Sequence, residues 1–261
     1  MKKSNLLNTL ILAALAAPGM AMAAEAPAVT SNVSLTTNYL YRGISQTGGK
    51  PALQGGFDYA HGSGFYVGVW GSNVSWVPAT SASLELDTYA GFKGGFAEDL
   101  SYDLGFLRYN YPGVYAEPLA VGSAKADTNE VYGAIGWKWV TLKYSHALGD
   151  TFGVADASGT SYVELNASYS LADSGVTLGA HYGKQTYKGM YADALKTAGT
   201  DPSYADYNLS VSKDVGGYVW GLKYSSTNVL KDTGFYTMTQ ADGSRTDLGK
   251  GTAILSVSHA M

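Results

Sequence analysis

The chain is dominated by segments in which apolar and polar residues strictly alternate. In SYVELNASYSL (residues 161–171), every second residue from Val163 to Leu171 is apolar or Tyr, and Glu164, Asn166 and serines stand between them. A period of two is typical of a β-strand whose two faces meet different surroundings. The apolar face of such segments carries no charge, so the pattern predicts strands that turn one face toward an apolar medium.

Twelve segments follow this pattern, and short and long connections alternate between them. A barrel with short periplasmic turns and long extracellular loops requires this alternation, whereas a Greek-key β-sandwich, the alternative that also alternates along its strands, does not. The predicted fold class is therefore all-β, a transmembrane antiparallel up-and-down β-barrel of about twelve strands. The predicted strands are 32–42, 51–60, 64–74, 83–94, 99–111, 129–138, 139–147, 161–171, 175–187, 205–214, 217–227 and 251–261.

Three local expectations follow from the parity of the strands. In segment 99–111 the apolar residues change parity, which predicts a β-bulge near Phe106. Lys213 falls on the apolar face, so we expect it at the periplasmic rim, where a lysine costs only about 0–1 kcal/mol. The segment 188–205 contains MYADALKTAG, which predicts a short helix in a long loop.

Tyrosines near strand ends predict two aromatic girdles at the membrane surfaces. At the start of the chain this reasoning places Tyr39 and Tyr41 against lipid at the outer rim. Arg42 then has the opposite parity and points into the mouth of the pore, and residues 43–49 form the first external loop.

The composition fits an exported membrane barrel. The chain has 33 Gly, 21 Tyr and no Cys, and only 15% of its residues are charged. Residues 1–23 have a basic start, a short apolar stretch and a small-residue AMA ending, which predicts a cleaved secretory signal peptide. Residues 24–261 then form a single outer-membrane barrel domain. The net charge of −4 argues against nucleic acid as a partner.

Three motifs resemble the TorF family of porins. They are YLYRGISQT from Tyr39, PALQGGFDYAHGSGFYVGVWGSNV from Pro51 and LELDTYAGFKG from Leu84. The resemblance is close over residues 37–75, and it implies an outer-membrane protein that forms a pore. The chain departs from the family at its end, where Met261 stands in place of the usual Phe.

The polar faces of the strands supply the candidate pore-lining residues. Charges of both signs across a narrow passage select polar solutes and set ion preference, so we expect a passive channel for small polar solutes or ions, with no cofactor and no metal. Twelve strands lie between the filled eight-stranded barrel and the open sixteen-stranded one, so an open and a plugged lumen both remain possible. The predicted lumen set is Arg42, Gln54, Asp58, Glu85, Asp87, Arg108, Glu130, Lys138, Lys143, Glu164, His181 and Lys223.

Two other functions remain as alternatives. A barrel-based enzyme that hydrolyses lipid or peptide needs a histidine base within hydrogen-bond reach of its partner, and His146 with Asp150 is the best pair available. A plugged barrel could instead act as a structural or adhesive protein through its long loops. The expected partners are outer-membrane lipids and lipopolysaccharide, the barrel-assembly machinery and small polar solutes. The pattern leaves open whether the barrel is a monomer or a homo-oligomer.

Overall fold

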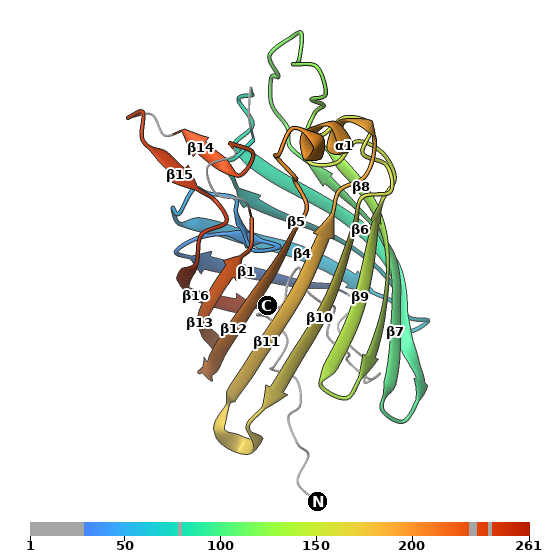
Figure 1. Cartoon of the computed structure of the whole chain (residues 1–261). Helices are drawn as coiled ribbons and strands as arrows, with labels where there is room; N and C mark the ends of the chain where they lie inside the picture. The colour runs from blue at the N-terminus through green and yellow to red at the C-terminus, as the bar shows by residue number, and fades with distance from the viewer. Residues whose placement is uncertain (1–28, 78–79, 230–233, 240–241) are drawn as a thin grey trace, which may run out of the picture.

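Twelve long strands close into one antiparallel barrel (Figure 1). The computed structural model describes residues 29–77, 80–229, 234–239 and 242–261; the predicted signal peptide and the start of the mature domain lie outside them. Each strand pairs with the next along the barrel, and β1 pairs with β16 to close it. The barrel strands are β1 (Val29–Thr36), β4 (Ala52–Ala60), β5 (Phe65–Asn73), β6 (Leu84–Ala97), β7 (Leu100–Asn110), β8 (Thr128–Trp137), β9 (Val140–Ala147), β10 (Ser161–Ser170), β11 (Val176–Thr186), β12 (Tyr204–Val215), β13 (Tyr218–Thr227) and β16 (Thr252–Ala260).

These strands confirm the predicted fold class and the twelve predicted segments, with one large difference at the first. Segment 32–42 was expected to be one strand, but β1 ends at Thr36. The bulge expected near Phe106 is wrong, because β7 pairs with both neighbours in unbroken register from Ser101 to Tyr109. The irregularity lies on β6 instead, between Gly95 and Ala97, next to a periplasmic turn.

The outward face of the barrel is an apolar belt edged with aromatic rings. Leu165, Leu222 and Leu209 are half exposed or more, as lipid-facing residues of a membrane barrel must be. Predicted girdle residues that are exposed on this face are Tyr59, Tyr144, Tyr169, Tyr182, Tyr207, Tyr218 and Tyr224. Lys213 is also outward and exposed, and it lies two residues before the end of β12, as expected for the rim. The chain is therefore an outer-membrane β-barrel.

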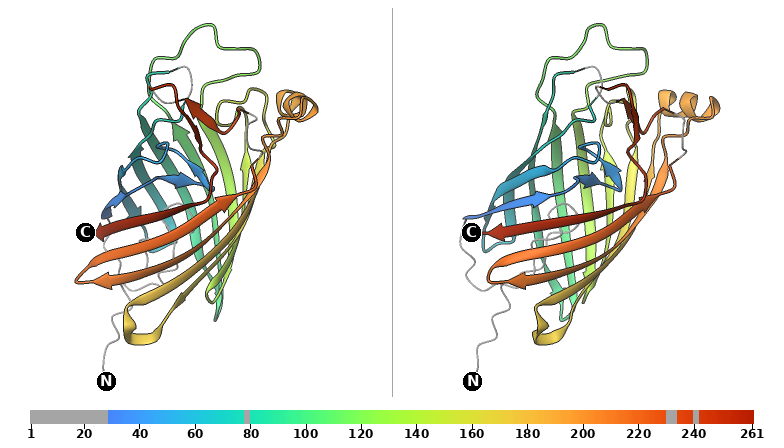
Figure 2. Two further views of the ribbon diagram at one scale, coloured as in Figure 1. Left: turned by 60° about the vertical axis from the view of Figure 1, so that its left-hand side comes forward. Right: turned by 90° about the vertical axis from the view of Figure 1, so that its left-hand side faces the viewer.

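The connections differ at the two ends of the barrel. At one end they are tight turns, such as Gly216–Gly217, where both residues have positive φ, and a 3₁₀ turn over Ala172–Ser174. At the other end the loops are long and carry α1 (Met190–Thr197), the predicted short helix, and a two-stranded ribbon of β14 (Thr237–Thr239) and β15 (Arg245–Asp247). Figure 2 shows the long loops and α1 together at this extracellular end. Within the described ranges, no helix has the length and apolarity needed to cross a membrane.

The first long loop does not extend outward but folds into the barrel. It forms a tight hairpin of β2 (Leu40–Tyr41) and β3 (Ile44–Ser45), which we call the inner hairpin. Tyr39 is only 3% exposed and packs edge-to-face on Trp70, an inward residue of β5. Tyr41 packs against Tyr109 on the inward face of β7. The expectation that both tyrosines face lipid is therefore wrong, because the strand that carried their parity ends before them.

Candidate functional site

The inner hairpin crosses the lumen and touches the far wall. Arg42 and Gly43 form its two-residue turn, with φ of 47° and 78°, and a two-residue hairpin with positive φ at both positions strongly favours Gly at one of them. A Cβ on Gly43 would lie 2.6 Å from atoms of Asp206 on β12 and Thr227 on β13. No side chain fits at this position, so glycine is what allows the turn to reach the opposite strands.

Arg42 fastens the turn to the wall with a bidentate ion pair. Its Nη1 and Nη2 atoms donate to the two carboxylate oxygens of Glu130 on β8, at 2.9 and 2.8 Å. Nη1 also donates to Oε1 of Gln185 on β11 at 2.9 Å. The guanidinium lies 4.3 Å from the ring centre of Tyr162 on β10, a cation–π distance. One side chain thus connects the hairpin to three strands of the far wall.

The ion pair between Arg42 and Glu130 is buried, so removing one partner costs more stability than it would in an exposed pair. The exposed fractions of the two side chains are 7% for Arg42 and 3% for Glu130. Burial alone would lower the pKa of the Arg42 guanidinium, but Glu130, Tyr41 and Tyr109 together outweigh burial and the pKa is raised. Breaking a buried pair by removing one partner typically costs about 3–5 kcal/mol. The pair therefore holds the hairpin against the wall strongly.

A second contact fixes the base of the hairpin on the acidic side of the lumen. The hydroxyl of Tyr39 donates to Oε1 of Glu85 on β6 at 3.2 Å. Asp87 follows on the same face, is 0% exposed, and neither of its carboxylate oxygens has a hydrogen-bond partner among the described residues. Buried carboxylates without donors are costly, so this wall attracts protons or cations.

Two polar networks line the rest of the lumen. His181 on β11 contacts Asp206 at 2.9 Å through Nε2 and Glu164 at 3.7 Å through Nδ1. On the other side, Lys143 on β9 lies 4.2 Å from the ring centre of Tyr132. Tyr132 shares a hydrogen bond with Tyr66, whose hydroxyl donates to Asp103 at 2.6 Å. Basic and acidic groups thus alternate around the interior.

Most of the predicted lumen residues lie on inward-facing positions, and two do not. Arg108 shares the outward parity of Leu104 and Phe106, since no bulge reverses it, and its side chain contacts Asp127 at 3.6 Å on the outer surface. Lys138 lies in the turn after β8, where it pairs with Asp99 at 3.4 Å. The inward-placed residues are Gln54, Asp58, Glu85, Asp87, Glu130, Lys143, Glu164, His181 and Lys223 on the strands, and Arg42 on the inner hairpin.

Sequence reasoning missed three charged lumen residues. Lys93, Asp103 and Asp206 occupy inward positions on β6, β7 and β12. The alternation of inward and outward positions predicts this facing, because each of the three residues stands next to an outward apolar residue in its strand. Asp214 also has inward parity, at the periplasmic end of β12, where it accepts the Gly217 N–H. Apart from it, the inward set among the described residues holds seven acidic side chains, Asp58, Glu85, Asp87, Asp103, Glu130, Glu164 and Asp206, against four basic ones, Arg42, Lys93, Lys143 and Lys223. Acidic side chains therefore outnumber basic ones at these inward positions.

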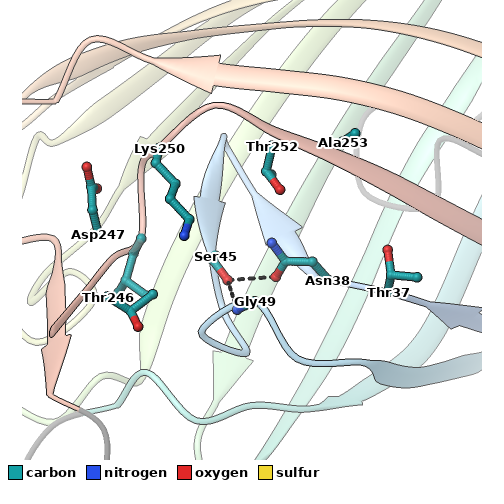
Figure 3. Close-up of a pocket in the computed structure, with 10 residues that line it drawn as sticks. Thr37, Asn38, Ser45, Gly49, Thr246, Asp247, Lys250, Thr252 and Ala253 are labelled. Atoms are coloured by element: carbon teal, nitrogen blue, oxygen red, sulfur yellow. Dashed lines mark hydrogen bonds between the residues drawn. The ribbon is translucent and has the colours of Figure 1, made fainter. Parts of the chain in front are cut away.

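A polar cavity of about 240 Å³ lies beside the inner hairpin at the extracellular end. Figure 3 shows Asn38 and Ser45 on the hairpin side and Lys250 and Thr252 on the side of the last loop. Ser45 Oγ donates to Oδ1 of Asn38 at 2.7 Å and accepts the Gly49 N–H at 3.0 Å. This cavity places hydroxyl, amide and ammonium groups where a polar solute would meet the hairpin.

His146 and Asp150, the candidate pair for the enzyme alternative, have separate partners. His146 contacts the Tyr144 hydroxyl at 3.1 Å, and Asp150 accepts the Asp156 N–H at 2.8 Å. No hydrogen bond or ion pair joins His146 to Asp150, so the structure does not form this candidate pair. Within the part of the chain that the structure describes, no group of three or more His, Asp or Glu residues could hold a metal ion.

Comparison with family models gives one match, which covers residues 20–261. The family is described as "Bacterial protein of unknown function (Gcw_chp)". This match supports an uncharacterised bacterial family and not the TorF name that the motifs resemble. No curated protein matches the sequence.

Solved outer-membrane barrels are similar to this chain in structure at very low sequence identity. A KdgM porin in complex with disordered oligogalacturonate has a TM-score of 0.48 and 9% identity, over 88% of this chain and 97% of that one. The NanC porin has a TM-score of 0.48 and 6% identity, over 89% and 98%. OprD from Pseudomonas aeruginosa has a TM-score of 0.38 and 13% identity, over 91% of this chain and 66% of its own.

Proposed function

This chain belongs to the bacterial family Gcw_chp, and we propose that it is an outer-membrane channel for passive diffusion of small polar solutes and ions, with a preference for cations. The observation that carries the proposal is the closed barrel with charged residues of both signs facing its interior. Rings of charge around a narrow passage set ion preference. Because acidic side chains outnumber basic ones at the inward positions, cations are favoured.

The inner hairpin sets the size limit of this channel. It occupies the lumen from β1 to the far wall, and the Arg42–Glu130 pair holds it there. Solutes then pass beside the hairpin, along a wall on which acidic and basic side chains stand next to each other, as Glu164 and Lys143 do on β10 and β9. A passage of this kind admits small polar molecules and excludes larger ones.

The test is electrical. Purified mature protein is inserted into a planar bilayer, and single-channel conductance and reversal potential are measured under a KCl gradient. We expect small discrete conductance steps and a reversal potential on the cation-selective side. Anion selectivity would contradict the role given to the inward carboxylates.

A plugged structural barrel is the second candidate, and the inner hairpin is the observation that favours it. In that case the hairpin completes a packed interior, with aromatic residues of β5, β7 and the long loops gathered around Tyr39. Wild-type protein and a variant with a released hairpin would then both fail to conduct. Conductance by the released variant alone would indicate a channel that opens.

A further inference from the structure

A second polar site lies on the outer surface of the barrel, separate from the lumen. A cavity of about 370 Å³ opens at the extracellular rim between β11, β12 and the loop that carries α1. Lys184, Lys188 and Lys196 line it, and all three are exposed. None of the three forms an ion pair with any residue in the described ranges. We call this cavity the rim groove, and we propose that it binds the phosphate groups of an outer-leaflet phosphorylated glycolipid.

Strand parity fixes the groove at the level of the lipid headgroups. Tyr182 and Lys184 are outward residues of β11, two positions apart, and Tyr182 is 55% exposed. At about 3.3 Å per residue the lysine lies about 7 Å further along the strand than the tyrosine, which is about 5 Å further out along the membrane normal for a strand tilted by about 40°. Tyrosine rings mark the membrane interface, so Lys184 lies in the layer where glycolipid phosphates are found. A free phosphate in solution would not need a site on the lipid-facing side of the wall.

The second wall of the groove is preformed. Ala192 on α1 is buried with Tyr187, Val154 and Ala157 in one hydrophobic cluster, so the helix is held by packing. Lys196 is one turn further along α1 and also lines the groove. The backbone N–H of Lys188 donates to Oγ1 of Thr160 at 3.1 Å, which fixes the chain between strand and helix. The lysines therefore come from a rigid strand, its fixed exit and a packed helix.

The acidic residues in the same lining do not cancel the lysines. Asp193 and Asp201 also line the groove, and Asp201 Oδ1 already accepts the backbone N–H of Ser203 at 2.9 Å. Three ammonium groups against two carboxylates leave the groove cationic. The hydroxyl groups of Ser203 and Thr186, which also line it, add donors suited to phosphate oxygens.

The test compares two matched charge reversals. The double variant K184E/K188E changes the rim groove, and K138E/K213E reverses the same number of lysines at the periplasmic end. Full-length mature proteins in detergent are titrated with fluorescently labelled bisphosphorylated lipid A and with the same lipid after phosphate removal. We expect the groove variant to bind bisphosphorylated lipid A at least about tenfold more weakly, because two charge-assisted contacts are lost, and the control to bind it as wild type does.

Three results would overturn the proposal. One is equal loss in the groove variant and in the control; another is equal binding of the dephosphorylated lipid by wild type. The third is displacement of the lipid by inorganic phosphate at equal concentration, which would indicate a free-anion site. If K184E/K188E does not assemble, K196Q on α1 lies outside the strands, and it is compared with K213Q at the periplasmic end, which neutralises the same number of lysines. Conductance is recorded for every variant, so failure of this site is distinguishable from failure of the channel.

Discussion

Replacing Arg42 by Ala removes one half of the buried ion pair that holds the inner hairpin in the lumen. The substitution leaves Glu130 as an unpaired carboxylate that is 3% exposed, and it also removes the bond to Gln185. Loss of one partner of a buried pair costs about 3–5 kcal/mol. Because each 1.4 kcal/mol is about a factor of ten in an equilibrium constant, the docked hairpin should lose about two to three and a half orders of magnitude in population relative to the released one. Alanine is preferable to glycine as the replacement. Residue 42 has a positive φ, which glycine adopts at little cost and other residues do not, so glycine would also change the stability of the turn.

The assay is single-channel conductance of wild type and Arg42→Ala in the same bilayer. We expect larger and noisier steps in the variant, since a released hairpin leaves the lumen wider and moves within it. The control is the double variant R42M/E130L, which replaces the buried pair by apolar side chains, a change that is often neutral or stabilising. It should conduct as wild type does. Equal conductance in wild type and Arg42→Ala would refute the idea that this ion pair restricts the pore.

The remaining predictions concern selectivity, membrane facing and the hairpin turn. The double variant K143E/K223E should move the reversal potential further toward cation selectivity, because it adds carboxylates to the lumen. Lys138→Glu in the periplasmic turn should leave the reversal potential unchanged, and equal shifts in the two variants would mean that the inward residues do not set selectivity. Leu165→Lys should impair assembly, seen as loss of the heat-modifiable folded band on a gel, because a lysine near the membrane midplane costs about 2–4 kcal/mol; normal assembly would show that the facing of β10 is wrong. Gly43→Ala should raise conductance as Arg42→Ala does, because its Cβ would lie 2.6 Å from the far wall; wild-type conductance in that variant would show that the turn does not touch the wall.

The strands and their facing could be predicted from the sequence because the membrane imposes a period of two on every barrel strand. Leu165, Leu222 and Tyr182 are exposed on the outer face as their parity predicts. Arg108, which the sequence analysis places in the lumen, faces outward instead. Leu107 and Tyr109 face inward and are buried there. Apolar and aromatic residues at inward positions imitate a change of parity, and a change of parity predicts a bulge that the strand does not have.

The inner hairpin could not be predicted from the same signal. Residues 37–41 continue the alternation of β1, and periodicity does not distinguish a tyrosine that faces lipid from one that is packed inside the barrel. What moves Tyr39 inside is its contact with Trp70 and Glu85, which are more than thirty residues away along the chain. The turn itself was visible in the Arg42-Gly43 pair, but its direction depends on Glu130 and Gln185, 88 and 143 residues away.

These long separations have a consequence for how the protein assembles. Arg42 and its partners Glu130 and Gln185 lie 88 and 143 residues apart along the chain. Contacts between such distant residues form slowly, because a long stretch of chain must first be brought together. The partners of Arg42 stand on β8, β10 and β11, so the inner hairpin can be held in its docked position only when these three strands already form part of the wall.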